Sequence, residues 1–223
     1  ASGWPDPNHL TTARDLTILA ISTIQDFPEF YHYYEEKTFS FNNIRQNNRN
    51  PALYKDLGAD GLKTGYTKAG GYGVTVSAVK GDRRLVLVIN GLKSKRLRTN
   101  ETERVLDWGF RNFRNYKLFD AGETVADGAV WMGNEDEIPL ITEKKIVMSL
   151  SRKQRRNMKV TLLLSTPIPA PISKGVRLGS LKIDIPGRKP VIHPIVSAGS
   201  VAKLSVLSRL KVSVKYLLWG ELE

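Results

Sequence analysis

The sequence of 223 residues contains no cysteine. That absence excludes disulfide bonds, thiolate metal ligands and a cysteine nucleophile from these residues. Apolar runs are also short, well below the ~20 residues that a membrane-spanning helix needs. The hydrophobic fraction of 41% and the charged fraction of 25% are those of a globular protein, and the length allows a sizeable core.

Patterns for cofactors are missing as well. His9, His32 and His193 share no spacing typical of metal ligands. The glycines around Gly71 lie between expected strands rather than at a helix start, where a phosphate-binding loop would end. We therefore expect neither a metal ion nor a cofactor.

Acidic residues are scarce in the second half of the chain. The formal net charge is +12. Residues 144–220 contain sixteen Lys and Arg but only one acidic residue, Asp184. Such an imbalance favours an anionic partner, which could be lipid head groups, nucleic acid or an acidic wall polymer. The alternative is a solvated basic surface with no specific partner.

The first half alternates helical and strand patterns. Thr12 followed by Asp15 is typical of a capping box, and apolar residues at helical spacing follow to Ile24. Pro28 can begin a second short helix. Three β-rich runs joined by Gly-bearing turns predict an antiparallel meander over residues 61–89. A helix is expected over 101–113, with Val105, Leu106, Trp108 and Phe113 on its buried side.

After Asn115 the pattern changes to short apolar runs separated by Gly and Pro. Regularly spaced short strands of this kind predict a small all-β domain. From Ser200 the spacing becomes helical again. Leucines and valines line one side there, and basic residues and Trp219 accompany them, which is typical of a helix lying in a membrane surface. The alternative is a helix packed on the protein's own β domain.

The tripeptide Lys63-Thr64-Gly65 is the candidate for a functional motif. On a strand that borders a cleft, a lysine supplies a fixed positive charge and a threonine hydroxyl donates a hydrogen bond, so together they can hold a carboxylate. The glycine keeps the strand open to an extended peptide. Lys-Thr-Gly is one of three elements of serine enzymes that react with β-lactams, beside Ser-x-x-Lys and a Ser-x-Asn triplet.

The surroundings of this tripeptide resemble a known family. The segment from Asp60 to Tyr72 is similar to the corresponding region of low-molecular-mass penicillin-binding proteins, the D-alanyl-D-alanine carboxypeptidases. Further similar segments are residues 2–15, 39–50 and 106–110. The resemblance implies an α+β fold. Residues 1–114 would be the C-terminal part of a transpeptidase domain of the penicillin-binding and β-lactamase type, 115–199 a small all-β domain and 200–223 an amphipathic helix.

The resemblance also implies a serine-type, penicillin-sensitive hydrolase that removes the terminal D-Ala from peptidoglycan stem peptides through an acyl-enzyme. Lys63 would support the nucleophilic centre, and the backbone N–H of Tyr66 would be half of the oxyanion hole. Substrate-binding residues would be Thr64, Gly65, Arg98 and Arg49. β-Lactams would be ligands. The location would be the bacterial periplasm, at the outer face of the cytoplasmic membrane, with residues 200–223 bound to anionic lipid.

The other two motifs of the family find no match. Ser-x-x-Lys begins at Ser77, Ser200 and Ser208. None fits, because the family's nucleophile precedes the Lys-Thr-Gly element and starts a helix, whereas Ser77 lies in an expected strand. Ser40-Phe41-Asn42 has the residue pattern of the Ser-x-Asn triplet, but it lies where the family has only a strand. We therefore expect the chain to be a C-terminal portion, inactive without an N-terminal segment of the same protein that bears the serine.

Two other functions remain open. A non-catalytic module that attaches to envelope or membrane would explain the β-rich half and the basic tail, but it has no need of the Lys-Thr-Gly element. A nucleic-acid binder would explain the charge, but the sequence has no aromatic and basic motif of known nucleic-acid-binding folds. We expect no nucleic-acid partner.

Overall fold

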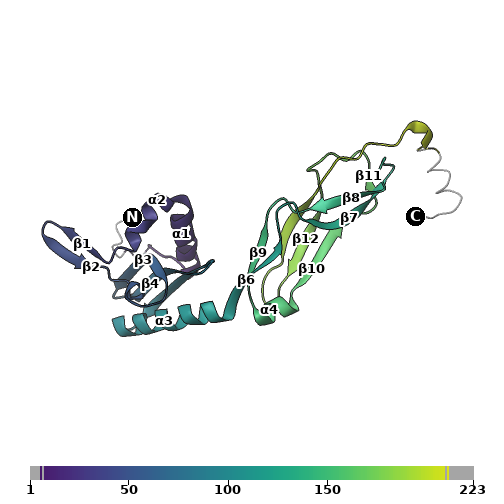
Figure 1. The fold of residues 1–223 in the computed structure, drawn as a ribbon. Coiled ribbons are helices and arrows are strands. Elements are labelled where there is room, and N and C mark those ends of the chain that lie inside the picture. The colour runs from purple at the N-terminus through teal and green to yellow at the C-terminus, as the bar shows by residue number, and fades with distance from the viewer. Residues whose placement is uncertain (1–5, 7, 209, 211–223) are drawn as a thin grey trace. The chain divides into compact units, whose positions relative to one another are not determined.

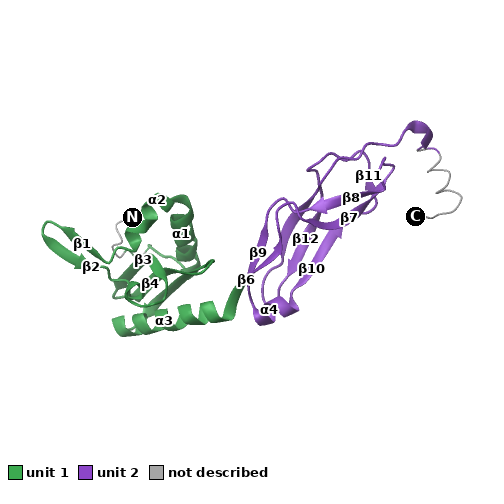
Figure 2. Cartoon of the chain, viewed as in Figure 1, with its two compact units in different colours: residues 1–114 green, residues 115–223 purple. Residues whose placement is uncertain are grey.

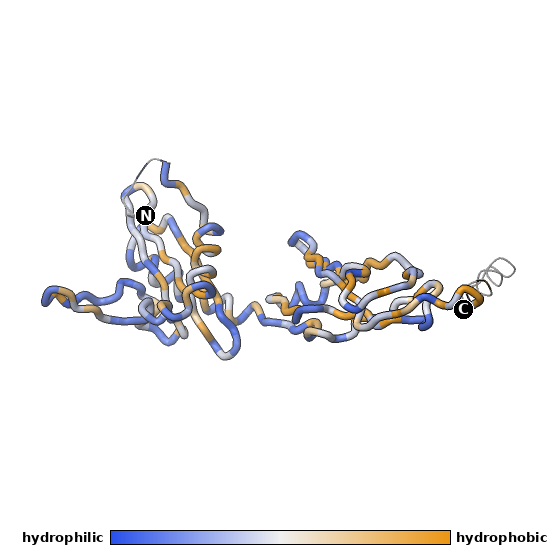
Figure 3. The backbone as a smooth tube through the Cα atoms, turned by 90° about the horizontal axis from the view of Figure 1, so that it is seen from above, coloured by the Kyte–Doolittle hydropathy of each residue, from blue (hydrophilic) through white to orange (hydrophobic). Residues whose placement is uncertain are grey.

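The computed structural model describes residues 6, 8–208 and 210. The chain divides into two compact units, Ala1–Arg114 and Asn115–Glu223 (Figures 1 and 2). Both units contain hydrophobic and hydrophilic stretches (Figure 3). Across the described residues, no helix combines the length and the hydropathy needed to cross a membrane. The content is α+β, as expected.

Unit 1 contains helices, a hairpin and a three-stranded sheet. Its elements are α1 (Ala13–Asp26), α2 (Pro28–Tyr31), η1 (His32–Tyr34), β1 (Thr38–Phe41), β2 (Ile44–Asn47), η2 (Pro51–Tyr54), β3 (Ala59–Thr67), β4 (Gly71–Lys80), β5 (Arg83–Leu92) and α3 (Lys95–Asn112).

The start of α1 confirms the predicted capping box. The Thr12 hydroxyl accepts a hydrogen bond from the Asp15 backbone N–H at 3.1 Å, and the Asp15 carboxylate accepts one from the Thr12 backbone N–H at 3.1 Å. Two N–H groups that the first turn cannot pair internally are thus satisfied. Pro28 lies at the start of α2, as predicted.

The predicted meander is confirmed as an antiparallel sheet in the order β3-β4-β5. One face of the sheet packs under α3. Its buried residues include Val74, Val76 and Ala78 of β4 and Leu106 of α3. On β3, Lys63 pairs with Thr75 and Thr64 with Val74, so Thr64 faces α3 and Lys63 faces the opposite side, on which α1 lies.

Helix α3 differs from its prediction in extent and in orientation. It begins at Lys95, six residues earlier than expected, because the Ser94 hydroxyl caps it by accepting a hydrogen bond from the Leu97 N–H. Its buried apolar residues are Leu106 and Phe110, whereas Trp108 is 52% exposed. The prediction for Trp108 is therefore wrong: Phe110 lies one helical turn after Leu106 and occupies the buried position instead.

Unit 2 is mostly β-structure, as predicted. Its elements are β6 (Phe113–Phe119, which begins at the unit boundary), β7 (Thr124–Trp131), β8 (Glu137–Ile141), β9 (Ile146–Ser151), α4 (Arg152–Asn157), β10 (Lys159–Leu164), β11 (Ile168–Pro169), β12 (Arg177–Asp184) and β13 (Val191–Ser197). Six strands form one sheet in the order β10-β12-β13-β8-β7-β11, and β6 pairs with β9. The sequence pattern did not predict α4.

The last helix does not begin at Ser200, as the sequence predicted, because the residues after β13 are still extended. Val201 and Lys203 form β-bridges with Ile172 and Gly133, so the chain is still extended there and packs on unit 2. Val201 is 3% exposed, which explains why this stretch stays with the sheet. Most of the predicted helix, residues 209 and 211–223, lies outside the described residues.

Candidate active site

The Lys-Thr-Gly element lies on a strand at the edge of the sheet, as predicted. β3 pairs with β4 and stands at one end of the strand order. Along it Lys63 and Gly65 are exposed, whereas Thr64 is 8% exposed. A methyl group added at Gly65 would meet no atom within 4 Å. The space beside Gly65 is therefore open to a ligand that approaches the backbone of β3.

The Lys63 ammonium group has no carboxylate partner among the described residues. Its Nζ atom donates a hydrogen bond to the carbonyl oxygen of Thr64 at 2.8 Å. This contact holds the side chain along the strand but does not neutralise its charge. The charge is thus available to an anionic ligand or to a reacting group.

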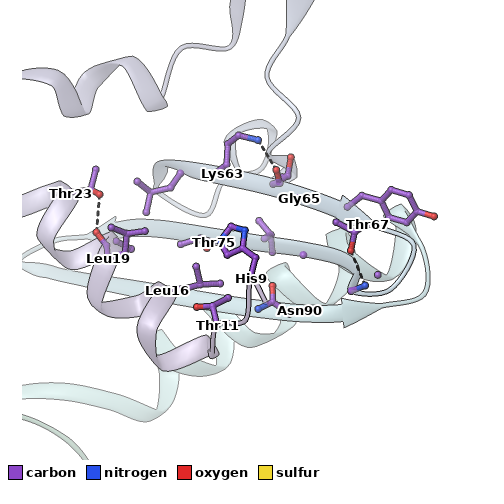
Figure 4. Close-up of a pocket in the computed structure, with 18 of the residues that line it drawn as sticks. His9, Thr11, Leu16, Leu19, Thr23, Lys63, Gly65, Thr67, Thr75 and Asn90 are labelled. Atoms are coloured by element: carbon purple, nitrogen blue, oxygen red, sulfur yellow. Dashed lines mark hydrogen bonds between the residues drawn. The ribbon is translucent and has the colours of Figure 1, made fainter. Parts of the chain in front are cut away.

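A cavity of about 620 Å³ borders β3 and lies against α1 (Figure 4). Its wall includes the residues from Lys63 to Thr67 on one side and Leu16, Leu19 and Thr23 of α1 on the other. The wall therefore combines an apolar helix surface with a polar strand, a composition typical of a ligand pocket.

Arg49 lies at a second, smaller cavity of about 250 Å³ that also contacts β3. Lys63 and Thr64 line this cavity together with Arg49 and Asn48. The structure thus brings three of the predicted site residues together: Lys63, Thr64 and Arg49. All three are polar, and two are basic, so this part of the site is suited to an anion.

Arg98 is buried near Arg49. Its side chain donates through Nη2 to the Arg49 carbonyl oxygen at 3.4 Å, and its guanidinium carbon lies 5.9 Å from the centre of the Tyr72 ring. The Nε atom is buried without a hydrogen-bond partner in the described structure. Burial lowers the pKa of Arg98, while the nearby Tyr72 opposes this. A buried cation without a carboxylate partner is costly, and a bound anion would compensate it.

Tyr66 follows Gly65 and has an exposed side chain. Its ring centre lies 4.4 Å from that of Tyr72, on the face of the sheet that also carries Thr64. The predicted role concerns its backbone N–H, and that role stays a prediction.

Sequence reasoning missed a polar cluster that fixes the beginning of β3. Tyr31 donates to the Asp60 carboxylate at 2.8 Å, and Arg84 forms an ion pair with the other Asp60 oxygen at 2.6 Å. Arg84 also donates to the Ser77 hydroxyl at 2.5 Å. The pKa of Tyr31 is raised to about 12, chiefly by burial. Four residues that are remote in sequence thus meet next to the Lys-Thr-Gly element, and only the position of Asp60 beside that element could have indicated it.

The serines that imitate the family's nucleophile have other contacts. Ser77 is fully buried in β4 and bonded to Arg84, away from the cavity wall. The Ser200 hydroxyl accepts a hydrogen bond from the Lys174 backbone N–H. Ser208 contacts Ser205, and its partner in the motif, Lys211, lies outside the described residues. Ser40 lies in the exposed strand β1.

Comparisons with known proteins agree on one family. The family model for D-alanyl-D-alanine carboxypeptidase matches residues 1–94, and that for the C-terminal domain of penicillin-binding protein 5 matches residues 113–203. The carboxypeptidase DacC of Escherichia coli is 35% identical over 221 residues, which is 97% of this chain and 55% of DacC. DacD of the same organism is 35% identical over 210 residues, which is 93% of this chain and 54% of DacD.

A solved structure gives the same result. Penicillin-binding protein 5 from Haemophilus influenzae superposes with a TM-score of 0.77 at 30% identity, over 90% of this chain and 59% of that protein. The chain spans about half the length of the curated relatives it matches. It belongs to the D-alanyl-D-alanine carboxypeptidase family of penicillin-binding proteins.

Proposed function

We propose that this chain supplies the substrate-binding strand of a serine-type D-alanyl-D-alanine carboxypeptidase. The observation that carries the proposal is the edge strand β3, with an unneutralised Lys63 and open space at Gly65 beside a large cavity. A peptide that ends in D-Ala-D-Ala would add to this edge as an extended strand. The main chain of the peptide would then pair with the main chain of β3.

The predicted site residues would have different roles. Thr64 would donate its hydroxyl to the terminal carboxylate, and Arg98 and Arg49 would supply positive charge near it. Lys63 would stabilise the negative charge that develops at the nucleophilic centre. The backbone N–H of Tyr66 would bind the oxygen of the tetrahedral intermediate.

The chemistry would follow an acyl-enzyme route. A serine hydroxyl oxygen attacks the carbonyl carbon of the bond between the two D-Ala residues, that C–N bond breaks, and the leaving amine takes the proton. Water then attacks the ester, which releases the shortened peptide and restores the serine hydroxyl. β-Lactams would form an ester with the same serine.

We propose that this serine lies on a polypeptide segment other than residues 1–223. The contacts of Ser77, Ser200 and Ser208 support this, because none of them lies at the cavity. Exposed apolar side chains on α1 and just before it offer a place for the companion segment, and two of them, Leu10 and Leu19, also line the cavity. Ile18 is 55% exposed and Leu19 63%, and Leu10, just before the helix, is 85% exposed. Large apolar side chains that are exposed in one segment are typical of an interaction site.

Labelling with a fluorescent penicillin tests the proposal. The chain alone should give no covalent adduct in intact-mass analysis. The chain co-expressed with a companion polypeptide that corresponds to the N-terminal part of a relative such as DacC, here called the reconstituted enzyme, should be labelled on the companion. Lys63→Ala should reduce that labelling by a factor of about 100 or more. An adduct on a serine of this chain would contradict the assignment.

A further inference from the structure

A cluster of basic side chains lies on unit 2. Helix α4 carries Arg152, Lys153, Arg155 and Arg156 within six residues, and all four are exposed. The turn between β12 and β13 adds exposed Arg188 and Lys189. We call these six residues the α4 patch.

The turn and the helix are held together. Arg188 donates to the Ser149 carbonyl oxygen at 3.3 Å and to the Gln154 side chain at 3.4 Å. Arg155 lies with its guanidinium carbon 5.7 Å from the centre of the Tyr116 ring. The Ser151 and Gln154 capping box fixes the start of α4. The charges are therefore displayed from a defined surface rather than from a loop tip.

The patch is not neutralised within the described structure. None of its six side chains forms an ion pair there. Asp184, the acid nearest in the strand register, pairs across the sheet with the position of Lys159 and forms its ion pair with Lys182 at 3.1 Å. The patch thus presents a concentrated positive charge to solvent.

We propose that the α4 patch binds the carboxylate groups of the peptide-substituted wall glycan. The inference rests on the proposed function, because that function makes this polymer the substrate, and its stem peptides end in carboxylates. Four of the six charges are arginines, whose guanidinium groups hold carboxylates with two parallel hydrogen bonds. Several weak contacts to one polymer would raise the local concentration of stem peptides through multivalency.

A membrane surface fits this patch less well. Helix α4 contains no apolar side chain that could enter a lipid layer. Within unit 2 it lies at the end where β6 begins. Residues 201–203, which lead to the basic tail, lie at the opposite end beside β11 (Figure 1).

Co-sedimentation with purified wall sacculi, freed of protein and attached polymers, tests the inference on the full chain. The variant R152Q/K153Q/R156Q removes three charges and keeps the capping box and the Arg155 contact. The control K144Q/K145Q/K174Q removes three exposed charges elsewhere in unit 2. We expect the patch variant to weaken binding about tenfold and the control less than twofold, and salt or amidation of the sacculus carboxylates to weaken binding of the unaltered chain.

Three outcomes would overturn the inference: equal binding of the patch variant and the control, binding that survives amidation, or a patch variant that loses binding to phosphatidylglycerol vesicles but keeps binding to sacculi. The double variant K63A/T64A separates this inference from the proposed function. It should lose penicillin labelling in the reconstituted enzyme and retain sacculus binding. If the unaltered reconstituted enzyme is not labelled while the α4 patch still binds sacculi, only the proposed function fails.

Discussion

The Tyr31 hydroxyl donates a hydrogen bond of 2.8 Å to Asp60, which lies at the beginning of the strand that carries Lys63. Through Asp60 and Arg84 this bond connects the segment after α1 to β5. Tyr31→Phe removes the donor and leaves the ring in place. We expect the free energy of unfolding to fall by about 1 kcal/mol. Urea denaturation of both proteins measures this, and Tyr33→Phe, at an exposed tyrosine, is the matched control.

The raised pKa of Tyr31 predicts a dependence of stability on alkaline pH. The folded protein keeps the phenol proton up to about pH 12, whereas the unfolded chain loses it near 10. Between these values the unfolded state binds fewer protons, so stability decreases as pH rises. The contribution is complete below pH 10. The melting temperature of the unaltered chain should therefore fall more steeply from pH 10 to 12 than that of Tyr31→Phe, and parallel curves would contradict the assignment.

Gly65 is expected to matter for ligands and not for folding. Because an added methyl group meets nothing there, Gly65→Ala should change the free energy of unfolding by less than about 0.5 kcal/mol. The same substitution at Gly58 is the contrast, because Gly58 has φ of +68° and its added methyl group would overlap the Val79 carbonyl oxygen. Gly58→Ala should cost more than about 1 kcal/mol.

In the reconstituted enzyme, Gly65→Ala should slow penicillin labelling about tenfold or more, since the new methyl group occupies the approach to β3. Unchanged labelling would show that the ligand does not lie along this strand.

Substitution of Arg98 should leave the stability of the fold unchanged or raise it, and should weaken ligand binding. Its charge is buried at 8% exposure without a carboxylate partner in the described residues. Arg98→Met keeps much of the packing volume and removes the desolvated charge, so the free energy of unfolding should stay within about 1 kcal/mol or rise. Penicillin labelling of the reconstituted enzyme should slow, and Arg98→Lys should restore part of it. If Arg98→Met unfolds, Arg98 is needed for the fold, and the expected role in ligand binding is contradicted.

The tail is expected to bind anionic lipid. Truncation after Leu204 keeps the bridges of Val201 and Lys203 with unit 2, so the β-structure should remain intact. Each basic residue near an anionic surface contributes about 1 kcal/mol, and the removed residues include Arg209, Lys211 and Lys215. Co-sedimentation with phosphatidylglycerol vesicles should therefore fall strongly. Equal binding by the truncated chain would favour the alternative, a helix that packs on the protein itself.

Local patterns in the sequence predicted much of the fold. Residue spacing and turn glycines were sufficient for α1, the meander and the β-rich unit, because these elements follow from periodicity and capping. Periodicity left two apolar faces of α3 open, one with Leu106 and Phe110 and one with Trp108, because tertiary packing decides which face contacts the sheet. Helix α4 was missed because it has no apolar residue to reveal a helical period.

The candidate site was predicted in part. The motif and its edge strand were visible in the sequence, since a short tripeptide carried the signal. The cavity wall from α1 was not, and neither was the Tyr31–Asp60–Arg84 cluster, because both depend on segments that meet only after folding. The roles of Lys63, Thr64, Tyr66 and the two arginines stay predictions, as does the division at residues 114 and 199.

The register of the sheet places Gly65 opposite Gly73. Two side chains are thus missing from adjacent strands at the cavity wall. The Asn90 amide lies next to Gly73, where a methyl group added to that glycine would approach the amide oxygen to 2.5 Å. A peptide crossing this bare stretch would meet main-chain groups and one amide. The strand would then select a peptide by its chain direction and length. Because the two glycines carry no side chains, peptide residues of different size would fit next to them.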